Sequence, residues 1–478
     1  MNIIKKITTL VFVSAFIFQA SYTEAAINSL EIISKNSSNV LGNDESASGS
    51  ISEDGLVISY MSSATNLVSG DTNAVADIFV YDSELDSLER VSVSSLGAEG
   101  DGESYVPVLS SDGRYVVFTS EATNLVTGDT NAQIDVFLHD RDTNTTELVS
   151  IAEDDGISDG ESSYGSVSSD GRYVVFNSTS TDIISGDTNG ASDVFVRDRV
   201  LETTTRVSVD SDEGELDGDS YAGSISRNGR YVIFESLATN ATDDSLNSAQ
   251  NIYLRDLTLG TTELISLNSS EISGNGGSFL NVPSNLVTDD GRYVLFGSNA
   301  TNLVSGDTNG AGDVFLRDRT LGTTVRISES VAGVQSDGES VQDSIDSGGR
   351  FISFRSESDL LVPGDTTSGE YDVFVYDMEL DNLFRVSVAE DGTESNGYSE
   401  SIGLFSSGSR YVVYYSGATN LVSGDTNGVL DVFLAEIADD DGISSAVEDA
   451  APNNGDVDES GYDDAIEPNI TSFVNSVS

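Results

Sequence analysis

The chain of 478 residues contains no cysteine and no tryptophan, and it has a single histidine. Without cysteine it can form neither disulfides nor thiolate metal sites, and thiol catalysis is excluded. The lone His139 leaves little room for zinc ligation or for histidine-based acid–base catalysis. Since Arg197 and Tyr81 stand at the matching position of related segments, we expect His139 to be an exposed side chain on a strand.

Positive charge is also scarce. The chain has 21 Lys and Arg residues against 81 Asp and Glu residues, which gives a formal net charge of -60. An acid excess of this size argues against a nucleic-acid partner and against anionic membrane surfaces, because both would repel the protein. It favours cations, divalent ones in particular, as the counter-charge.

A long apolar run occurs only near the N-terminus. Lys5 and Lys6, followed by the apolar stretch 10–20, are typical of a secretory signal, which we assign to residues 1–25. The alternative is an uncleaved anchor. We expect no membrane span after signal removal, and a secreted or cell-surface protein, with the periplasm as the other destination.

What the chain has in abundance is repetition. A segment like that of residues 110–140 recurs seven times, at intervals of about 58 residues. Copies of its GRYVVF motif begin at Gly55, Gly113, Gly171, Gly229, Gly291, Gly349 and Ser409. A second apolar run, of the DVFLHD type, begins at Asp77, Asp135, Asp193, Asn251, Asp313, Asp372 and Asp431. A fixed period of this kind is the signature of a repeat architecture.

Each repeat predicts four short strands, exemplified by residues 104–111, 114–120, 135–140 and 147–152. An Asp-Gly pair at Gly113 predicts a tight turn between the first two strands. In RYVVF the side chains on both faces of the strand are apolar, whereas a sheet with one wet face would alternate. A sheet packed between two similar sheets fits this pattern, and that is the environment of a propeller blade.

The count of strands predicts how the ring closes. Six copies of the fourth strand accompany seven copies of the others, and the spare strand at residues 30–34 supplies the seventh. We therefore predict an all-β fold, a seven-bladed β-propeller with four antiparallel strands per blade, spanning residues 27–436. The N-terminal strand closes it on the last blade, which removes an exposed edge. Residues 437–478 form a separate acidic tail.

The pattern DGRYVVF…DVF…RVS resembles the TolB-like propeller repeat, a relative of the WD-repeat propellers, over residues 30–434. The resemblance implies a periplasmic, surface or secreted propeller that mostly binds rather than catalyses. The α/β domain that precedes the propeller in TolB is lacking here, so the translocation role does not carry over. The tail looks like the acidic calcium-binding linkers that precede surface-anchor modules.

Five loops between the second and third strands share the motif D-x-N-G/A-x-x-D, and we call them the GDTN loops. Calcium prefers such oxygen ligands on a tight loop, but Asp and Asn also form Asx-turns, so both interpretations stay open. Blades four and six have drifted from the motif. The candidate metal ligands are Asp71, Asn73, Asp77, Asp129, Asn131, Asp135, Asp187, Asn189, Asp193, Asp307, Asn309, Asp313, Asp425, Asn427 and Asp431.

The tail holds a second candidate calcium site, with the spacing of an EF-hand loop and Gly461 at its sixth position. Its candidate ligands are Asp456, Asp458, Ser460, Asp464 and Glu467. The alternative is a disordered acidic linker.

The Arg after each turn glycine, such as Arg114, recurs too regularly for an active site, and we expect it to pair with the Asp that ends the third strand, such as Asp140. The breaks in the repeat near Phe279 and Thr242 are candidate binding spots, and ordinary sequence drift is the alternative. No catalytic motif is present. We expect a non-enzymatic, monomeric scaffold that binds a protein or a glycan, with calcium-stabilised loops. The alternatives are a hydrolase or lyase acting over the central channel, and a structural cell-surface protein.

Overall fold

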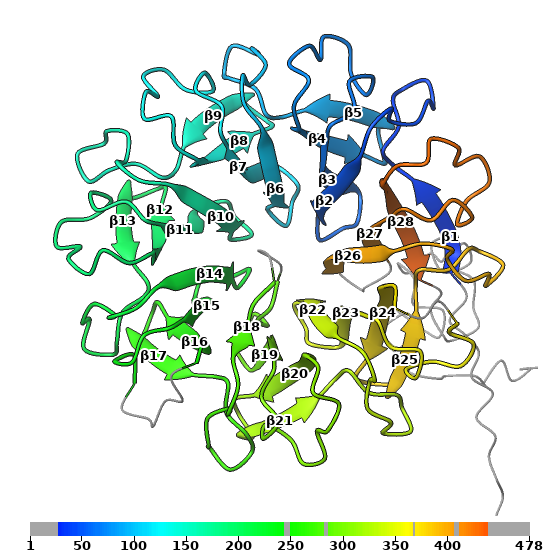
Figure 1. The fold of residues 1–478 in the computed structure, drawn as a ribbon. Coiled ribbons are helices and arrows are strands. Elements are labelled where there is room, and N and C mark those ends of the chain that lie inside the picture. The colour runs from blue at the N-terminus through cyan, green and yellow to red at the C-terminus, as the bar shows by residue number, and fades with distance from the viewer. Residues whose placement is uncertain (1–26, 243–248, 282–284, 367–368, 406–410, 438–478) are drawn as a thin grey trace, which may run out of the picture.

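A computed structural model of the chain describes residues 27–242, 249–281, 285–366, 369–405 and 411–437. These residues form seven four-stranded antiparallel sheets arranged as the blades of a ring (Figure 1). The predicted seven-bladed propeller is therefore confirmed. None of the described residues belongs to a helix long and apolar enough to cross a membrane.

Each blade runs outward from the ring axis in four strands. We number the blades 1 to 7 in the order of their innermost strands, β2 (Ser46–Ile51), β6 (Ser104–Leu109), β10 (Ser162–Val167), β14 (Ser220–Ile225), β18 (Ser278–Phe279), β22 (Ser340–Ile345) and β26 (Ser399–Phe405). The second strands are β3 (Val57–Ser62), β7 (Tyr115–Ser120), β11 (Tyr173–Ser178), β15 (Tyr231–Ser236), β19 (Tyr293–Ser298), β23 (Phe351–Ser356) and β27 (Tyr411–Ser416).

The two outer positions complete each blade. The third strands are β4 (Asp77–Asp82), β8 (Asp135–Asp140), β12 (Asp193–Asp198), β16 (Asn251–Asp256), β20 (Asp313–Asp318), β24 (Asp372–Asp377) and β28 (Asp431–Ile437). The outermost strands are β5 (Ser87–Arg90), β9 (Thr145–Leu148), β13 (Thr203–Arg206), β17 (Thr261–Leu264), β21 (Thr323–Arg326), β25 (Asn382–Arg385) and, in blade 7, β1 (Ile27–Ile32).

The N-terminal strand closes the ring, as the strand count predicts. β1 pairs antiparallel with β28, and Leu30 lies opposite Ala435 while Ile32 lies opposite Phe433. Leu30 and Ile32 are buried in one core cluster with Phe433. Immediately after β1, Ser34 Oγ donates a 2.6 Å hydrogen bond to Asp431 Oδ1. The two ends of the propeller are thus joined by backbone pairing, apolar packing and a buried polar contact.

The core lies between blades, because each blade is apolar on both faces. Val116, Val117 and Phe118 of β7 are all fully buried, although neighbouring side chains on a strand point to opposite faces. Within the blade, Phe118 packs on Phe137 with ring centroids 5.9 Å apart. Aromatic pairs at the same position recur in every blade, as Tyr60–Phe79, Phe176–Phe195, Phe234–Tyr253, Phe296–Phe315, Phe354–Phe374 and Tyr414–Phe433.

The predicted turn and its ion pair are both confirmed. Gly171 has φ of 68°, and a Cβ atom there would lie 2.1 Å from the ring of Tyr115 in the preceding blade. Arg114 donates two hydrogen bonds to Asp140, of 2.9 and 2.7 Å. The same pair recurs as Arg172–Asp198, Arg230–Asp256, Arg292–Asp318 and Arg350–Asp377. These arginines therefore tie the second strand of a blade to its third.

Two expectations from the sequence are wrong. The fourth strand of blade 2 is Thr145–Leu148 rather than residues 147–152, because the ladder ends where Val149 hydrogen-bonds back to Val136. His139 is buried, with 2% of its surface exposed, and its Nδ1 lies 2.9 Å from Thr146 Oγ1. Thr146 in turn donates to the carbonyl of Val93 in the preceding blade, so packing between blades covers the histidine.

Ring closure can be tested at Leu30. Replacing Leu30 with Ala removes buried apolar contacts with the last blade and should lower the free energy of unfolding by about 2–4 kcal/mol. Glu31, exposed on the same strand, is the matched control, and Glu31→Ala should cost less than about 1 kcal/mol. Urea unfolding followed by circular dichroism measures both, and equal midpoints for the two variants would argue against closure through β1.

Candidate functional site: acidic loops and a cluster near the ring axis

Each GDTN loop brings two aspartates together at the start of a third strand. In blade 3 these are Asp187 in the loop and Asp193, the first residue of β12. Asp193 is completely buried; its Oδ1 accepts a 2.6 Å hydrogen bond from Ser208 and its Oδ2 a 3.2 Å bond from Asn189. The matching pairs are Asp71 and Asp77, Asp129 and Asp135, Asp307 and Asp313, Asp365 and Asp372, and Asp425 and Asp431.

The loop asparagine shapes the turn. Asn189 Oδ1 accepts a hydrogen bond from the backbone N–H of Ala191, and its Nδ2 also donates to the carbonyl of Leu216. Asn73, Asn131 and Asn309 make the same turn bond to the residue two positions later. The Asx-turn therefore accounts for the asparagine of these loops, and its side-chain oxygen is already used as an acceptor.

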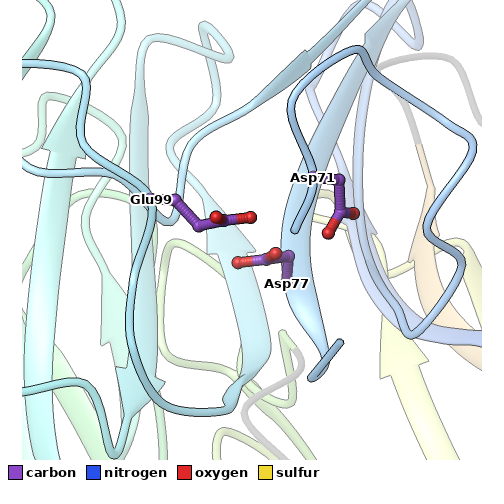
Figure 2. A group of neighbouring side chains, drawn as sticks. All are labelled: Asp71, Asp77 and Glu99. Atoms are coloured by element: carbon purple, nitrogen blue, oxygen red, sulfur yellow. The ribbon is translucent and has the colours of Figure 1, made fainter. Parts of the chain in front are cut away.

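A glutamate that sequence reasoning missed completes three of these sites. Asp71 and Asp77 lie with Glu99 such that one carboxylate oxygen of each falls within 4.8 Å of the others, and such a group could hold a metal ion (Figure 2). Glu99 belongs to the segment leading from β5 into blade 2. The other two triads are Asp187, Asp193 and Glu215 in blade 3, and Asp365, Asp372 and Glu394 in blade 6.

An arginine already sits among the carboxylates of each triad. In blade 1, Arg90 Nη1 lies 3.6 Å from Asp71, 3.0 Å from Asp77 and 2.6 Å from Glu99. In blade 6, Arg385 Nη1 lies 3.1, 3.4 and 2.9 Å from Asp365, Asp372 and Glu394. A metal ion bound in a triad would have to compete with this guanidinium for the same oxygens.

The two acids beside Arg206 differ in pKa because one is buried and the other is not. Burial raises the pKa of Asp193 to about 6, although hydrogen bonds from Ser208 and the charge of Arg206 oppose the shift. Burial also acts to raise the pKa of Glu215, but hydrogen bonds from Thr188 and Arg206 prevail and lower it to about 2. Glu215 is therefore ionised at neutral pH, whereas burial makes ionisation of Asp193 less favourable.

The arginine and the third acid change together from blade to blade. Blades 1, 3 and 6 have Arg at the end of the fourth strand and Glu nine positions later. In blade 5 the residue nine positions after Arg326 is Gln335 instead of Glu, and its Nε2 donates a hydrogen bond to Asp307. The remaining blades have apolar or small residues at both positions, namely Leu148 and Ile157, Leu264 and Ser273, and Ile32 and Leu41. This joint variation is the signal in the sequence that could have identified the triads.

A different cluster lies near the ring axis, where the repeat varies. Every second strand ends in a serine, Ser62, Ser120, Ser178, Ser236, Ser298, Ser356 or Ser416. The residue just before this serine is of a different type in all seven blades: Met61, Thr119, Asn177, Glu235, Gly297, Arg355 and Tyr415. The framework is therefore uniform, and an adjacent position facing the neighbouring blade is free to differ.

Arg355 is the centre of this axial cluster. It lies 2.8 Å from Asp343 of β22 and 2.9 Å from Glu400 of β26. The side-chain oxygen of Asn281, just after β18, also accepts from Arg355 at 2.8 Å. Glu235 of blade 4 accepts a 2.7 Å bond from the N–H of Leu280. Polar contacts thus join blade 4 to blade 5 at Leu280, and blade 5 to blades 6 and 7 through Asn281 and Arg355, close to the sequence irregularity at Phe279.

Burial tunes the acids of the axial cluster. It raises the pKa of Glu235 to about 7, against the opposing hydrogen bond from Leu280. It also raises the pKa of Asp343 to about 7, although Arg355 lies beside it. At the opposite end of the innermost strands, Arg227 of blade 4 forms a 3.0 Å ion pair with Glu53 of blade 1. That pair links turns from separate blades. The axial cluster lies at the other end of the innermost strands, which is the end that carries the GDTN loops.

Several predicted sites lie outside the described residues. These are the signal segment, the tail ligands Asp456, Asp458, Ser460, Asp464 and Glu467, and most of the altered loop after Thr242. Their assignments stay predictions.

Comparison with known proteins identifies the architecture only. No family model and no curated protein matches the sequence. Among solved structures, a putative TolB from Agrobacterium tumefaciens is 15% identical with a TM-score of 0.38, covering 65% of this chain and 87% of that one. An oligogalacturonate lyase from Vibrio parahaemolyticus is 10% identical, with a TM-score of 0.49 and coverage of 86% and 97%. A prolyl endopeptidase is 12% identical, with a TM-score of 0.50, covering 82% of this chain and 50% of that one.

These solved structures include a putative TolB, a lyase and an endopeptidase. The protein is thus a seven-bladed propeller with structural similarity to TolB-like propellers and to the propellers of proteases and lyases. At such low identity the similarity describes the fold, and function has to be argued from the site.

The pairing of arginine and glutamate can be tested in blade 3. Arg206→Leu leaves three clustered acids, of which Asp193 is completely buried, without their cation and should lower the free energy of unfolding by about 3–5 kcal/mol. Adding Glu215→Ile reproduces the residues of blade 2 and should restore much of the loss. Chemical denaturation of the wild type and both variants measures this; a double variant less stable than the single one would refute the coupling.

The pH dependence of stability tests the axial cluster. Because the pKa of Glu235 in the folded protein is raised to about 7, the folded state binds this proton more tightly than the unfolded state does. Its contribution is fully present below the unfolded pKa of about 4.3 and is lost as pH rises through 7. Melting temperatures measured from pH 5 to pH 8 should fall more steeply for the wild type than for Glu235→Gln. Parallel curves would contradict the shift.

Proposed function

We propose that the protein is an exported, non-enzymatic binding scaffold whose partner, a protein or a glycan, contacts the innermost strands at the end that carries the GDTN loops. The observation that carries the proposal is the position before the terminal serine of each second strand. Seven residue types in seven blades, next to an unchanging serine, show that this position of the repeat varies more than its neighbours. Repeated positions maintain the scaffold, whereas these varied positions, which are buried or half-buried, change the packing beneath the exposed part of the innermost strands from blade to blade.

Aromatic side chains extend the same zone across blades 2 to 4. Tyr164 lies on the innermost strand β10 at a bulge, with φ of 56°, and is 43% exposed. Tyr105 and Tyr221 lie on the neighbouring innermost strands and are partly buried. Tyrosine offers an apolar ring and a hydroxyl together, a combination suited to sugar rings and to peptide side chains.

The charge of the protein narrows the class of partner. At -60 the chain repels polyanions, so neutral or cationic partners fit and nucleic acids do not. Six of the seven outermost strands are only four residues long, and short edge strands resist pairing with other chains. A monomeric scaffold follows from this proposal.

Calcium is the ion we propose for the GDTN loops. Carboxylates and carbonyls are the available ligands, and oxygen-only sites favour calcium over zinc or copper. The ion would fix loops at the same end as the proposed binding surface. The acidic tail, with its EF-hand spacing, is proposed as a further calcium site.

A hydrolase or lyase is the second candidate, and the axial acids favour it. Glu235 and Asp343 both have a pKa near 7, which suits a general acid or base, and Arg355 lies beside Asp343. Such values also arise in purely structural clusters.

Binding can be tested on immobilised neutral and cationic glycans, such as glucan, mannan and chitosan. Tyr164→Ala should weaken binding about tenfold, in line with the loss of one well-packed aromatic contact of 1.4 kcal/mol. Leu321→Ala, which changes an exposed side chain on the outer turn of blade 5, is the matched control and should bind normally. Equal binding by both variants would overturn the proposed surface. Release of shortened sugars, abolished by Glu235→Gln, would favour the enzyme instead.

A further inference from the structure

Two blades keep the aspartate pair but have lost the arginine. In blade 2, Asp129 and Asp135 remain, while Leu148 and Ile157 replace the arginine and glutamate. In blade 7, Asp425 and Asp431 remain, while β1 contributes Ile32 and the segment after it contributes Leu41. Neither aspartate pair forms an ion pair with any residue in the described part of the chain. Blades 2 and 7 therefore each hold two neighbouring acids without the arginine that lies beside them in blade 1.

The consequence is visible at the loop aspartate. Asp129 and Asp425 are each only 8% exposed, and the Oδ1 atom of each is buried without a hydrogen-bond partner. In blade 7 the Oδ1 of Asn427 is likewise buried without a partner. The matching Oδ1 atom of Asp71 in blade 1 also lacks a hydrogen-bond partner, but there Arg90 lies 3.6 Å from it and supplies the positive charge. The backbone N–H groups of Asn131 and Asn427 donate to the carboxyl groups of Asp129 and Asp425, but the two Oδ1 atoms have neither a donor nor a cation. A buried carboxylate oxygen in that state is unfavourable, so these atoms indicate a ligand that carries positive charge.

We propose that blades 2 and 7 each bind one divalent cation of the calcium class, one between Asp129 and Asp135 and one between Asp425 and Asp431. The triads of blades 1, 3 and 6 hold arginine instead. This inference rests on the calcium part of the proposed function and restricts it to the GDTN loops of blades 2 and 7. The arginine of one set of blades and the ion of the other fill the same role in the repeat.

The backbone offers further oxygen ligands at both positions. In blade 1 the carbonyl of Gly70 accepts a 3.3 Å hydrogen bond from Arg90 Nη2. Gly128 and Gly424 occupy the same place in blades 2 and 7, and all three have a positive φ between 90° and 103°. Nothing lies within 4 Å of the Cβ position of any of them, so water can approach. Two carboxylates, one carbonyl and waters make an all-oxygen ligand set of the type that calcium prefers.

The number of bound ions tests this assignment directly. Titration of the full chain with calcium chloride in a calorimeter, at pH 7.5 and fixed ionic strength, counts the ions. Asp129→Asn and Asp425→Asn should each remove one ion, and the double variant should remove two. Asp71→Asn is the matched control, since it changes the same position in an arginine-containing blade, and it should remove none. An unchanged count in Asp129→Asn and Asp425→Asn, or an equal loss in Asp71→Asn, would overturn the proposal.

A transplant between blades provides a second test that does not remove an acid. Leu148→Arg with Ile157→Glu installs the blade 1 residues in blade 2 and should abolish one calcium ion while the fold is kept. Melting in EDTA shows whether each variant folds, and Asp129→Asn should then melt no lower than the wild type. If the transplant variant still bound the same number of calcium ions, the proposal that the arginine and the ion occupy the same position would be wrong. Repeating the glycan-binding assay of Tyr164→Ala in EDTA distinguishes failure of the binding surface from failure of the ion sites.

Discussion

The closed ring depends on one constraint: each blade is apolar on both faces and must be covered on both sides. Val116 and Phe118 are buried in one core cluster with Val57 and Ile78 of the preceding blade. Val117, on the other face of the strand, is buried in a cluster with Val174 of the next blade. A linear stack would leave two such faces in water. The pairing of β1 with β28 removes both exposed ends at once, so ring closure and burial of the core are the same event.

The repeat buries an aspartate at the start of most third strands, and two kinds of contact stabilise the acids there. The aspartate that opens each third strand is anchored to a serine of the following segment, as Asp193 is to Ser208. In blades 1, 3 and 6, an arginine then balances the aspartates and brings a glutamate with it. Where the arginine is replaced by Leu148 or Ile32, the glutamate is replaced too. The coupling follows from electrostatics, because a third buried acid is tolerable only beside a cation.

The axial cluster is held together by contacts between blades as well as within one blade. Arg114 and its equivalents repeat because each ties two strands of one blade, so the same geometry recurs around the ring. Arg355 instead joins Asp343 of its own blade to Glu400 of the next and to Asn281 of the one before. Residues that bridge different blades near the axis need not be alike, and this freedom makes the axis the place where a uniform scaffold can acquire a specific surface.

The sequence by itself determined the fold: the apolar period set the strands, the spare N-terminal strand set the closure, and the Arg114–Asp140 pair followed from their regular spacing. It also identified the aspartates of the GDTN loops. Only the tertiary structure placed Glu215 beside Asp187 and buried His139, because both depend on segments that packing between blades brings together. The repeat pattern in the sequence reveals contacts within a blade, because they recur at a fixed spacing. Contacts between blades become apparent only in the closed ring.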